Sequence, residues 1–451
     1  MRKPKKTYSV VVDRMEPKGV SAIDKNAKRW SFRGAAIGDS VVIRGKGKSK
    51  AYIVSHEQKS PDAILPKCDI FGLCGGCQFQ TMSLHHQREE KEKMIRRLIG
   101  EVPGSFYPII GDDGYYYRNK IELSFGTQCY VREDEKDKIG LTGSFLGFHP
   151  SGWFSKIIPV HHCPIATKQI NQLIPIIQKQ NLGPAWSTKT FAGKWRHIVF
   201  RQGEDGVLVG LLTSTDTPRK DVVSVANQLA EQECVSGVLW ITTDRLSEVA
   251  IGDVKEILYG NATLTAKLNG KQLEIPHDGF FQVNNAGAQL LINAIKQAAG
   301  CGEVLVDLYC GVGAIGIALA DSFTKVIGIE LHALAVEQAR KNAKNNNVSG
   351  QWYVGKVEEE IPKLNLPKTK TIVVDPPRVG LHPKVAAFLA NETAESLIYV
   401  ACNPKSLVRD REILEQGNWR LHDIWSVDLF PQTPHVEVVG KFVRKEKTHE
   451  E

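Results

Sequence analysis

The chain has 451 residues, 42% of them hydrophobic and 24% charged, and these proportions are ordinary for a globular protein with two or three domains. No apolar run approaches the roughly 20 residues that a membrane-spanning helix needs, and the basic N-terminus lacks a signal-peptide core, so we expect a cytoplasmic protein with no membrane partner. The net charge of +8 permits a polyanionic partner, and nine cysteines spread through a long chain disfavour a secreted disulfide framework.

Residues 1–58 predict a small β-barrel. Short runs of strand-forming residues, such as YSVVVDRM and DSVVIRGKGK, are separated by glycines, a pattern typical of barrels that bind oligonucleotides. Lysines and arginines are interleaved with aromatic residues, among them Tyr8, Trp30 and Tyr52. Such a surface suits phosphate contacts and base stacking. A charged barrel with no nucleic-acid ligand is the alternative.

Residues 59–275 predict a central domain that is mixed and mostly β. A helix is expected over residues 83–102, capped by Ser83 and with an apolar side that includes Met94 and Ile95. From about residue 116 to residue 268, strand-like runs such as RNKIELSFG and GVLVGLLTS predominate.

A cysteine cluster lies in this central region. Cys68, Cys74 and Cys77 follow a C-x5-C-x2-C spacing in a glycine-rich stretch, and Cys163 stands far downstream. Three close thiolates and one distant thiolate favour an iron–sulfur centre, near to but different from the plant ferredoxin spacing. A four-ligand zinc site remains open, with a neighbouring histidine replacing one cysteine at position 161 or 162.

Residues 276–451 alternate between helical and strand patterns. This alternation predicts an α/β fold with a doubly wound parallel sheet, in which ligands bind at the carboxyl ends of the strands. The overall expectation is therefore a Rossmann-like C-terminal domain that follows a mostly β domain and a small OB-like barrel.

The run VDLYCGVGAIGI places Gly311 and Gly313 after a strand and at the start of a helix, where the backbone can turn tightly around a ligand. Glu330 at the tip of the next strand suits ribose hydroxyls. These features alone fit NAD, FAD or S-adenosylmethionine. Asp375, followed by two prolines in VVDPPRVG, favours a methyltransferase because the prolines stiffen a loop beyond the sheet.

Cys402 ends a strand in LIYVACNPKSL and should lie at the same sheet edge. A buried structural cysteine is the simpler interpretation. Carbon 5 of a pyrimidine, however, is a poor nucleophile until a thiolate adds to C6, and the C5 proton must then be removed. Glu437, in VDLFPQTPHVEVV, could be that base. The pair predicts methylation of a pyrimidine carbon.

The stretches FFQVN, DLYCGVG, VDPPRVG, YVACNPKSL and LFPQTPHVE, in this order, resemble the RNA uracil-C5 methyltransferases that use S-adenosylmethionine. The resemblance covers about residues 276 to 440. It implies that Cys402 is the nucleophile and Glu437 the general base. By the same resemblance, the cofactor contacts are Gln282, Tyr309, Glu330 and Asp375, with Phe280 stacking on the substrate.

Further parts of the chain are similar to members that act on 23S ribosomal RNA. The first region resembles their TRAM domain, and the cysteine pattern implies a [4Fe-4S] cluster. YRNKIELSFG resembles a segment near the substrate, which implies RNA contacts by Arg118 and Lys120. Ala314 and Lys356 depart from the polar and acidic residues that many members carry there.

The sequence therefore predicts a monomeric enzyme that makes 5-methyluridine in RNA, with 23S rRNA favoured as the substrate. Methylation of tRNA is the first alternative. A cytosine-C5 methyltransferase is another, although such enzymes usually carry a Pro-Cys pair where this chain has ACNP. A non-catalytic RNA-binding protein is the alternative from a different class.

Overall fold

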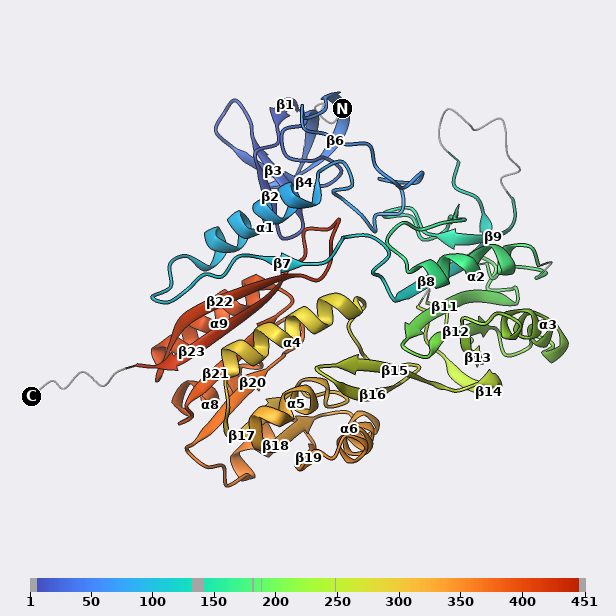
Figure 1. Cartoon of the computed structure of the whole chain (residues 1–451). Coiled ribbons are helices and arrows are strands. Elements are labelled where there is room, and N and C mark those ends of the chain that lie inside the picture. The colour runs from blue at the N-terminus through green and yellow to red at the C-terminus, as the bar shows by residue number, and fades with distance from the viewer. Residues whose placement is uncertain (1–5, 132–141, 181, 188, 248, 446–451) are drawn as a thin grey trace, which may run out of the picture.

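The structure is a computed structural model that describes residues 6–131, 142–180, 182–187, 189–247 and 249–445. Three large sheets follow one another along the chain, from blue through green to red in Figure 1. Within the described ranges, no helix is long and apolar enough to cross a membrane.

The N-terminal region forms a six-stranded mixed sheet in the order β1-β5-β6-β4-β3-β2. Its strands are β1 (Thr7–Val11), β2 (Arg14–Glu16), β3 (Gly19–Ile23), β4 (Arg29–Phe32), β5 (Ser40–Lys46) and β6 (Lys50–Gln58). Trp30 is buried, and its indole N–H donates to Asp24 Oδ2 at 2.8 Å. A Cβ at Gly45 would lie 2.7 Å from the Trp30 ring, so this close approach requires a glycine.

The central region forms a seven-stranded sheet in the order β10-β9-β8-β11-β12-β13-β14. The strands are β8 (Lys120–Gln128), β9 (Thr142–Phe148), β10 (Ile158–Pro159), β11 (Trp195–Gly203), β12 (Gly206–Thr213), β13 (Val235–Thr242) and β14 (Asp253–Gly260). Helices α2 (Lys168–Gln178) and α3 (Arg219–Ala230) pack beside it. The hairpin of β15 (Thr263–Leu268) and β16 (Lys271–Pro276) leads into the C-terminal region.

The C-terminal region is built on an eight-stranded sheet in the order β19-β18-β17-β20-β21-β23-β22-β7. Its strands are β7 (Ile110–Gly111), β17 (Gly302–Leu308), β18 (Phe323–Glu330), β19 (Gly350–Val354), β20 (Lys370–Val374), β21 (Ser396–Ala401), β22 (Trp419–Asp428) and β23 (Glu437–Arg444). β17 to β21 are parallel, whereas β23 runs antiparallel to both of its neighbours.

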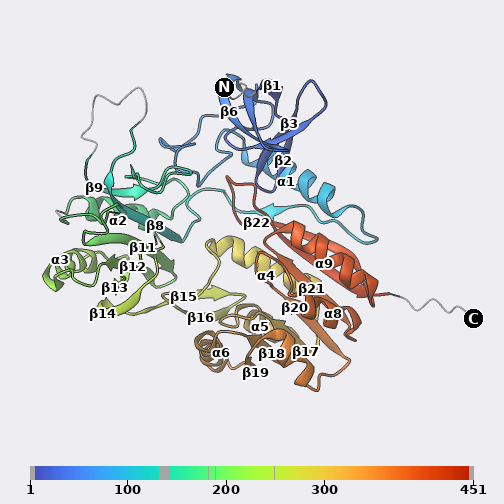
Figure 2. The same cartoon turned by 180° about the vertical axis from the view of Figure 1, so that it is seen from behind.

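Helices cover both faces of this sheet (Figures 1 and 2). One face buries α4 (Asn285–Ala299), α5 (Ala314–Leu319) and α6 (Ala333–Asn345), and the other buries α7 (Val357–Glu360), α8 (Pro383–Asn391) and α9 (Pro404–Gln416). Short 3-10 turns, η2 (Ala320–Ser322) and η3 (Ile361–Lys363), follow α5 and α7. The predicted mixed α/β architecture is confirmed.

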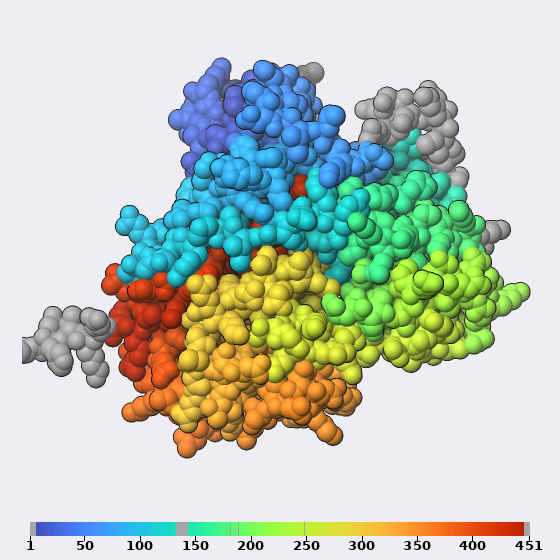
Figure 3. Space-filling model, in the orientation of Figure 1, coloured from blue at the N-terminus to red at the C-terminus, as the bar shows by residue number. Residues whose placement is uncertain are grey.

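Helix α1 (Leu84–Ile99) begins as predicted at Ser83, whose hydroxyl accepts a hydrogen bond from the His86 N–H at 3.2 Å. The helix packs between α9 and the N-terminal strand β2. Strand β7 then pairs in parallel with the end of β22. In Figure 3 the blue and cyan surface that includes α1 lies directly on the red C-terminal region. The edge strand of the C-terminal sheet thus comes from an early part of the chain.

A buried ion pair joins α1 to this sheet. Lys91 and Asp428 are both fully buried and in contact, and the Lys91 ammonium also donates to Phe430 O at 3.2 Å. Lys91→Met leaves Asp428 buried beside Arg88, whose Nε is 3.3 Å away, and should lower the free energy of unfolding by about 3 kcal/mol. Urea denaturation measures this loss. An equal loss in Lys93→Met, at an exposed site of the same helix, would contradict the role of the pair.

Candidate active site

Four predicted site residues lie at one edge of the C-terminal sheet. Leu308 pairs with both Ile329 and Val374, so β17, β18 and β20 end level with one another. The carboxyl ends of parallel strands form the usual ligand-binding edge of such a sheet. Tyr309 follows β17, Glu330 ends β18, Asp375 follows β20, and Cys402 follows β21. The structure therefore brings together the loops that the sequence motifs single out.

The glycine turn after β17 is shaped by left-handed backbone conformations. Tyr309, Gly311 and Gly313 have φ of 64°, 55° and 82°. A Cβ at Gly313 would lie 2.9 Å from the Ile317 side chain, so a glycine is needed there. The Gly311 N–H donates to Glu330 Oε2 at 3.2 Å. This bond ties the turn to the tip of β18 and leaves bare backbone for a ligand to approach.

Asp307, which the motif analysis did not single out, lies beneath this turn. It is fully buried, and its Oδ2 accepts a hydrogen bond from the Gly316 N–H at 2.8 Å. Burial raises the pKa of Asp307 to about 7. The carboxylate organises the start of α5. An aspartate inside the otherwise apolar run VLVDL was the available signal.

Cys402 and Glu437 face each other across two antiparallel strands. Ala401 of β21 pairs with Val438 of β23. Continuing this register by one residue places Cys402 opposite Glu437. Side chains at opposed positions lie on the same face, with Cβ atoms about 4.5–5.5 Å apart. Glu437 is 2% exposed, whereas Cys402 keeps part of its surface open. The two predicted reacting groups are therefore neighbours, although 35 positions separate them in sequence.

The acidic groups at this edge hold their protons strongly. Burial raises the pKa of Glu437 to about 8, and the nearby Asp375 adds to the effect. Burial also raises the pKa of Asp375 to about 7. The pKa of Cys402 rises to about 11, chiefly through burial and then through the charges of Glu437 and Asp375. A positive charge brought to this edge would favour the ionised forms.

Arg378 is the cation that opposes these shifts. It belongs to the DPPR stretch, is exposed, and lowers the pKa values of both Cys402 and Glu437. Its Nη2 lies 3.4 Å from His435 Nδ1. Burial, helped by Arg378, lowers the pKa of His435 to about 4, which keeps that imidazole neutral. The DPPR motif by itself indicates no role for this arginine.

The FFQVN stretch leads into α4 beside the central region. Phe280 is 76% exposed, as a base-stacking residue would need to be. The backbone carbonyls of Gln282 and Val283 accept hydrogen bonds from Asn119, at 3.0 Å from its side chain and at 2.8 Å from its N–H. The contact of Gln282 with a cofactor stays a prediction.

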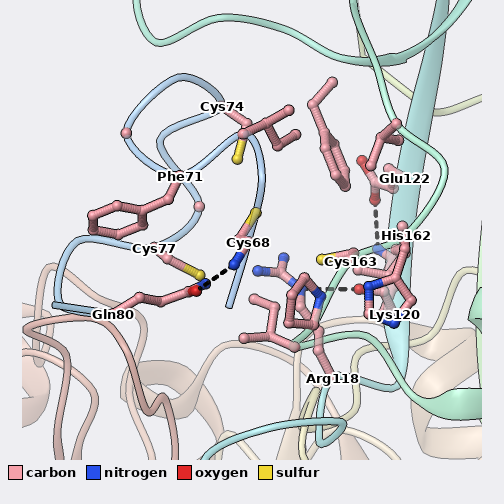
Figure 4. A pocket seen from close by; sticks show the side chains of 18 of the residues that line it. Cys68, Phe71, Cys74, Cys77, Gln80, Arg118, Lys120, Glu122, His162 and Cys163 are labelled. Atoms are coloured by element: carbon pink, nitrogen blue, oxygen red, sulfur yellow. Dashed lines mark hydrogen bonds and ion pairs between the residues drawn. The ribbon is translucent and has the colours of Figure 1, made fainter. Parts of the chain in front are cut away.

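The four predicted cluster cysteines line one cavity of about 400 Å³ (Figure 4). Burial, with a smaller effect from the neighbouring thiols of Cys74 and Cys163, raises the pKa of Cys68 to about 11 and that of Cys77 to about 12. In the described part of the chain, no three His, Cys, Asp or Glu side chains form a group that could hold a metal ion. The cysteines share a cavity without closing on a common centre.

Arg118 and Lys120 also line this cavity (Figure 4). Arg118 Nε donates to the Lys120 carbonyl at 3.0 Å, and Lys120 Nζ lies 2.9 Å from Glu122 Oε1. His162 lines the cavity, whereas His161 is bonded to Gln178 at 2.8 Å. The predicted contacts of Arg118 and Lys120 with RNA are not tested by this placement.

Comparison with known proteins identifies the family. The profile described as tRNA (uracil-5-)-methyltransferase matches residues 84–446. The chain belongs to this family. An uncharacterized RNA methyltransferase of Caldanaerobacter subterraneus subsp. tengcongensis is 32% identical to it over 96% of this chain and 97% of its own length. The tRNA (uracil(54)-C(5))-methyltransferase of Pyrococcus horikoshii is 32% identical over 91% of this chain and 94% of its own.

A solved relative gives the same result in three dimensions. The tRNA (uracil-54, C5)-methyltransferase of Pyrococcus abyssi, in complex with S-adenosyl-L-homocysteine, aligns with a TM-score of 0.76 and 26% identity, over 96% of this chain and 100% of that chain. This tRNA (uracil-5-)-methyltransferase family member is therefore an S-adenosylmethionine-dependent RNA methyltransferase, and that prediction from its sequence is confirmed.

Proposed function

We propose that this enzyme methylates carbon 5 of a uridine in RNA, with Cys402 as the nucleophile and Glu437 as the general base. The observation that carries the proposal is the strand register, which sets the two side chains opposite each other at the ligand-binding edge of the sheet. A half-open thiol beside a buried carboxylate suits addition followed by proton removal.

In the proposed reaction, the Cys402 sulfur adds to C6 of the uracil, and C5 gains the electron density that makes it nucleophilic. When bound, S-adenosylmethionine would supply the electrophilic methyl group that C5 takes up, and would leave as S-adenosylhomocysteine. Glu437 then takes the proton from C5, the C5–C6 double bond re-forms, and the electron pair of the C6–S bond returns to the sulfur. The thiolate is thereby regenerated, and the protonated Glu437 must release its proton before the next turnover.

The residues at the sheet edge fit the cofactor. A Cβ at Gly311 would meet nothing within 4 Å, so the backbone of the turn is open to a ligand there, and Glu330 keeps unused acceptor positions beside the two backbone hydrogen bonds that it accepts. We propose that Glu330 binds the ribose hydroxyls and that Tyr309, Gln282 and Asp375 complete the site. We propose that Asp375, whose charge raises the pKa of Glu437, also holds the uracil edge.

The rate of methylation should rise with pH. Glu437 must be ionised to accept a proton, and its pKa is raised to about 8, so the active form is lost as the pH falls below that value. We expect kcat to rise between about pH 6 and about pH 8 as Glu437 ionises, and the raised pKa of the Cys402 thiol to add to the rise. A profile that stays flat over this range would count against Glu437 as the base.

We propose 23S rRNA as the substrate to test first, and tRNA as the second candidate. The tRNA candidate is favoured by the Pyrococcus horikoshii relative, which is named a tRNA (uracil(54)-C(5))-methyltransferase. Nucleoside analysis of separated 23S rRNA and tRNA from cells without this protein tests both. We expect either the 23S rRNA or the tRNA of these cells to lack a 5-methyluridine. Loss of 5-methylcytidine would support cytosine chemistry instead, and no loss in either RNA would contradict the proposal.

We further propose that the N-terminal six-stranded sheet is a TRAM-type RNA-binding barrel. Lys28 lies 3.8 Å above the Trp30 ring, and Tyr8 packs against the same ring at 5.7 Å between centroids. The buried Trp30 ring supports these two side chains, and the half-buried Tyr8 and the exposed Tyr52 are the aromatic side chains available for stacking on a single-stranded nucleic acid. This surface would hold the RNA while the target base reaches the active site.

We also propose that Cys68, Cys74, Cys77 and Cys163 hold a [4Fe-4S] cluster. Four thiols around one cavity are a suitable donor set, and a cluster of several irons spreads its ligands more widely than a single ion does. Burial, and then the neighbouring thiols, raise the pKa values of Cys68 and Cys77, and a bound cation would favour their thiolate forms. The cluster would have a structural role, because methyl transfer moves no electrons.

Cys77→Ser should remove most of the iron and sulfide from anaerobically purified protein, together with the visible absorbance of a cluster, because serine is a poor ligand for it. Metal and sulfide analysis measures the loss. The matched control is Cys234→Ser, at a half-buried cysteine outside the cavity. If the wild-type protein contained stoichiometric zinc and no sulfide, the four cysteines would form a zinc site and the cluster proposal would be wrong.

A further inference from the structure

The loop that precedes Glu437 is held by segments from far earlier in the chain. This loop, residues 429–436, connects β22 to β23 and directly precedes Glu437, the proposed base, at the sheet edge. Tyr117 Oη donates to Pro431 O at 3.0 Å, and Asn284 Nδ2 donates to Leu429 O at 3.1 Å. The carbonyls of Leu429 and Pro431 are thus fixed by residues that precede β17 in the chain.

The centre of this arrangement is a buried pair of glutamines. Gln87 of α1 is fully buried, and Gln432 is 2% exposed. The Gln432 N–H donates to Gln87 Oε1 at 2.9 Å, and Gln87 Nε2 donates to Gln432 Oε1, also at 2.9 Å. Gln432 adopts a left-handed backbone conformation with φ of 67°, which costs energy for a residue other than glycine. The reciprocal bonds hold it in that conformation.

The cysteine-rich segment contacts the same residue. The N–H groups of Gln78 and Phe79, which directly follow Cys77, both donate to the Gln432 carbonyl, at 2.7 and 3.1 Å. Gln87 Nε2 also lies 3.0 Å from Phe79 O. One amide side chain on α1 therefore links the cysteine-rich segment to the 429–436 loop.

We infer that Gln87 is a positioning residue for catalysis. It acts through Gln432 to hold Glu437, the proposed general base, in its position at the sheet edge. This inference rests on the proposed function. Gln87 does not touch the reacting atoms. We predict that a change at Gln87 slows proton removal, the second half of the reaction, because the 429–436 loop leads directly into Glu437. Cys402 follows β21 and belongs to a different loop of the sheet.

The substitution Gln87→Met keeps the length of the side chain and removes its hydrogen bonds. We expect kcat to fall by about tenfold to 10²-fold, because small displacements of a catalytic group have effects of this size, with KM for RNA unchanged within about twofold. We also expect a covalent protein–RNA adduct to accumulate on denaturing gels, because addition proceeds while proton removal is slow. A loss of folded protein alone would lower kcat without trapping an adduct.

The matched control is Gln228→Met. Gln228 and Gln180 form a similar reciprocal pair in the central region, at 2.9 Å from Gln228 Nε2 to Gln180 Oε1, and this pair does not contact the 429–436 loop. The control should keep the wild-type kcat and give no adduct. Gln432→Asn tests the same contact from the other side with less change in the core, since asparagine tolerates the left-handed conformation. It should repeat the Gln87→Met result.

Glu437→Gln in the same assay separates the possible failures. If Glu437→Gln traps an adduct and neither Gln87→Met nor Gln432→Asn does, the positioning role is wrong and the proposed function stands. If Glu437→Gln itself traps none, the proposed mechanism fails and the positioning role fails with it. Wild-type kcat in Gln432→Asn would overturn the inference even if Gln87→Met did not fold.

Discussion

Cys402→Ala should abolish methylation of RNA, by on the order of 10⁴-fold or more, because removal of a catalytic nucleophile has effects of this size. Without the sulfur, C5 of uracil has no route to becoming a nucleophile. The variant should still bind S-adenosylmethionine, because the residues proposed to hold the cofactor follow other strands and are unchanged. Transfer of labelled methyl groups to RNA measures the rate, and calorimetry measures cofactor binding.

The matched control for this substitution is Cys301→Ala, which makes the same chemical change at an exposed position after α4. It should keep full activity. If Cys402→Ala also retained methylation, the covalent mechanism would be excluded. If it failed to bind the cofactor, the lost activity would not identify a nucleophile, and Cys402→Ser would then have to show the same loss of rate with binding retained.

Glu437→Gln should slow turnover by about 10² to 10⁴-fold, the usual contribution of a general base, and should trap the covalent intermediate. The amide cannot accept the C5 proton, so the bond from Cys402 to C6 persists. A slowly migrating protein–RNA band on a denaturing gel, absent from the double variant with Cys402→Ala, measures the adduct. Glu412→Gln, at an exposed site on α9, should show neither effect.

The same variant should be more stable than the wild type at alkaline pH. Burial raises the pKa of Glu437 from 4.5 to about 8, so its protonated form stabilises the fold at low pH, and that contribution is lost as the pH rises towards 8. Glutamine stays neutral throughout. Thermal unfolding at about pH 9 should show a gain of at most about 5 kcal/mol over the wild type. A lower melting temperature for the variant at that pH would contradict the raised pKa.

Local motifs predicted much of the site. The glycine turn at Gly311 and Gly313 and the strand tip at Glu330 follow from short sequence patterns, because backbone geometry at strand ends is a local property. The positions of Cys402 and Glu437 required one further step. The sequence predicts the pair because methylation of C5 needs both a nucleophile and a base. In the structure, the strand register brings the two residues opposite each other.

Long-range contacts could not be predicted in this way. Gln87 and Gln432 lie 345 positions apart, and nothing in the helical pattern around Gln87 distinguishes it from a surface amide. Arg378 acts through its electric field on groups in other loops, which no spacing reveals. Strand β7 has two residues, too few for any periodic signal.

That two-residue strand affects how the protein must fold. β7 pairs with Val427 and Asp428, and residues 105 and 107 just before it bond to the backbone of Ile424; without this segment the outer edge of β22 would expose unpaired backbone groups, which is a known risk for aggregation. β7 is synthesised long before β22. Their pairing closes a large loop of the chain, so we expect it to form late and slowly during folding. Until β7 pairs with β22, the chain should be prone to aggregate through the exposed edge of β22. A fragment starting at residue 276 lacks β7 and should stay prone to aggregation.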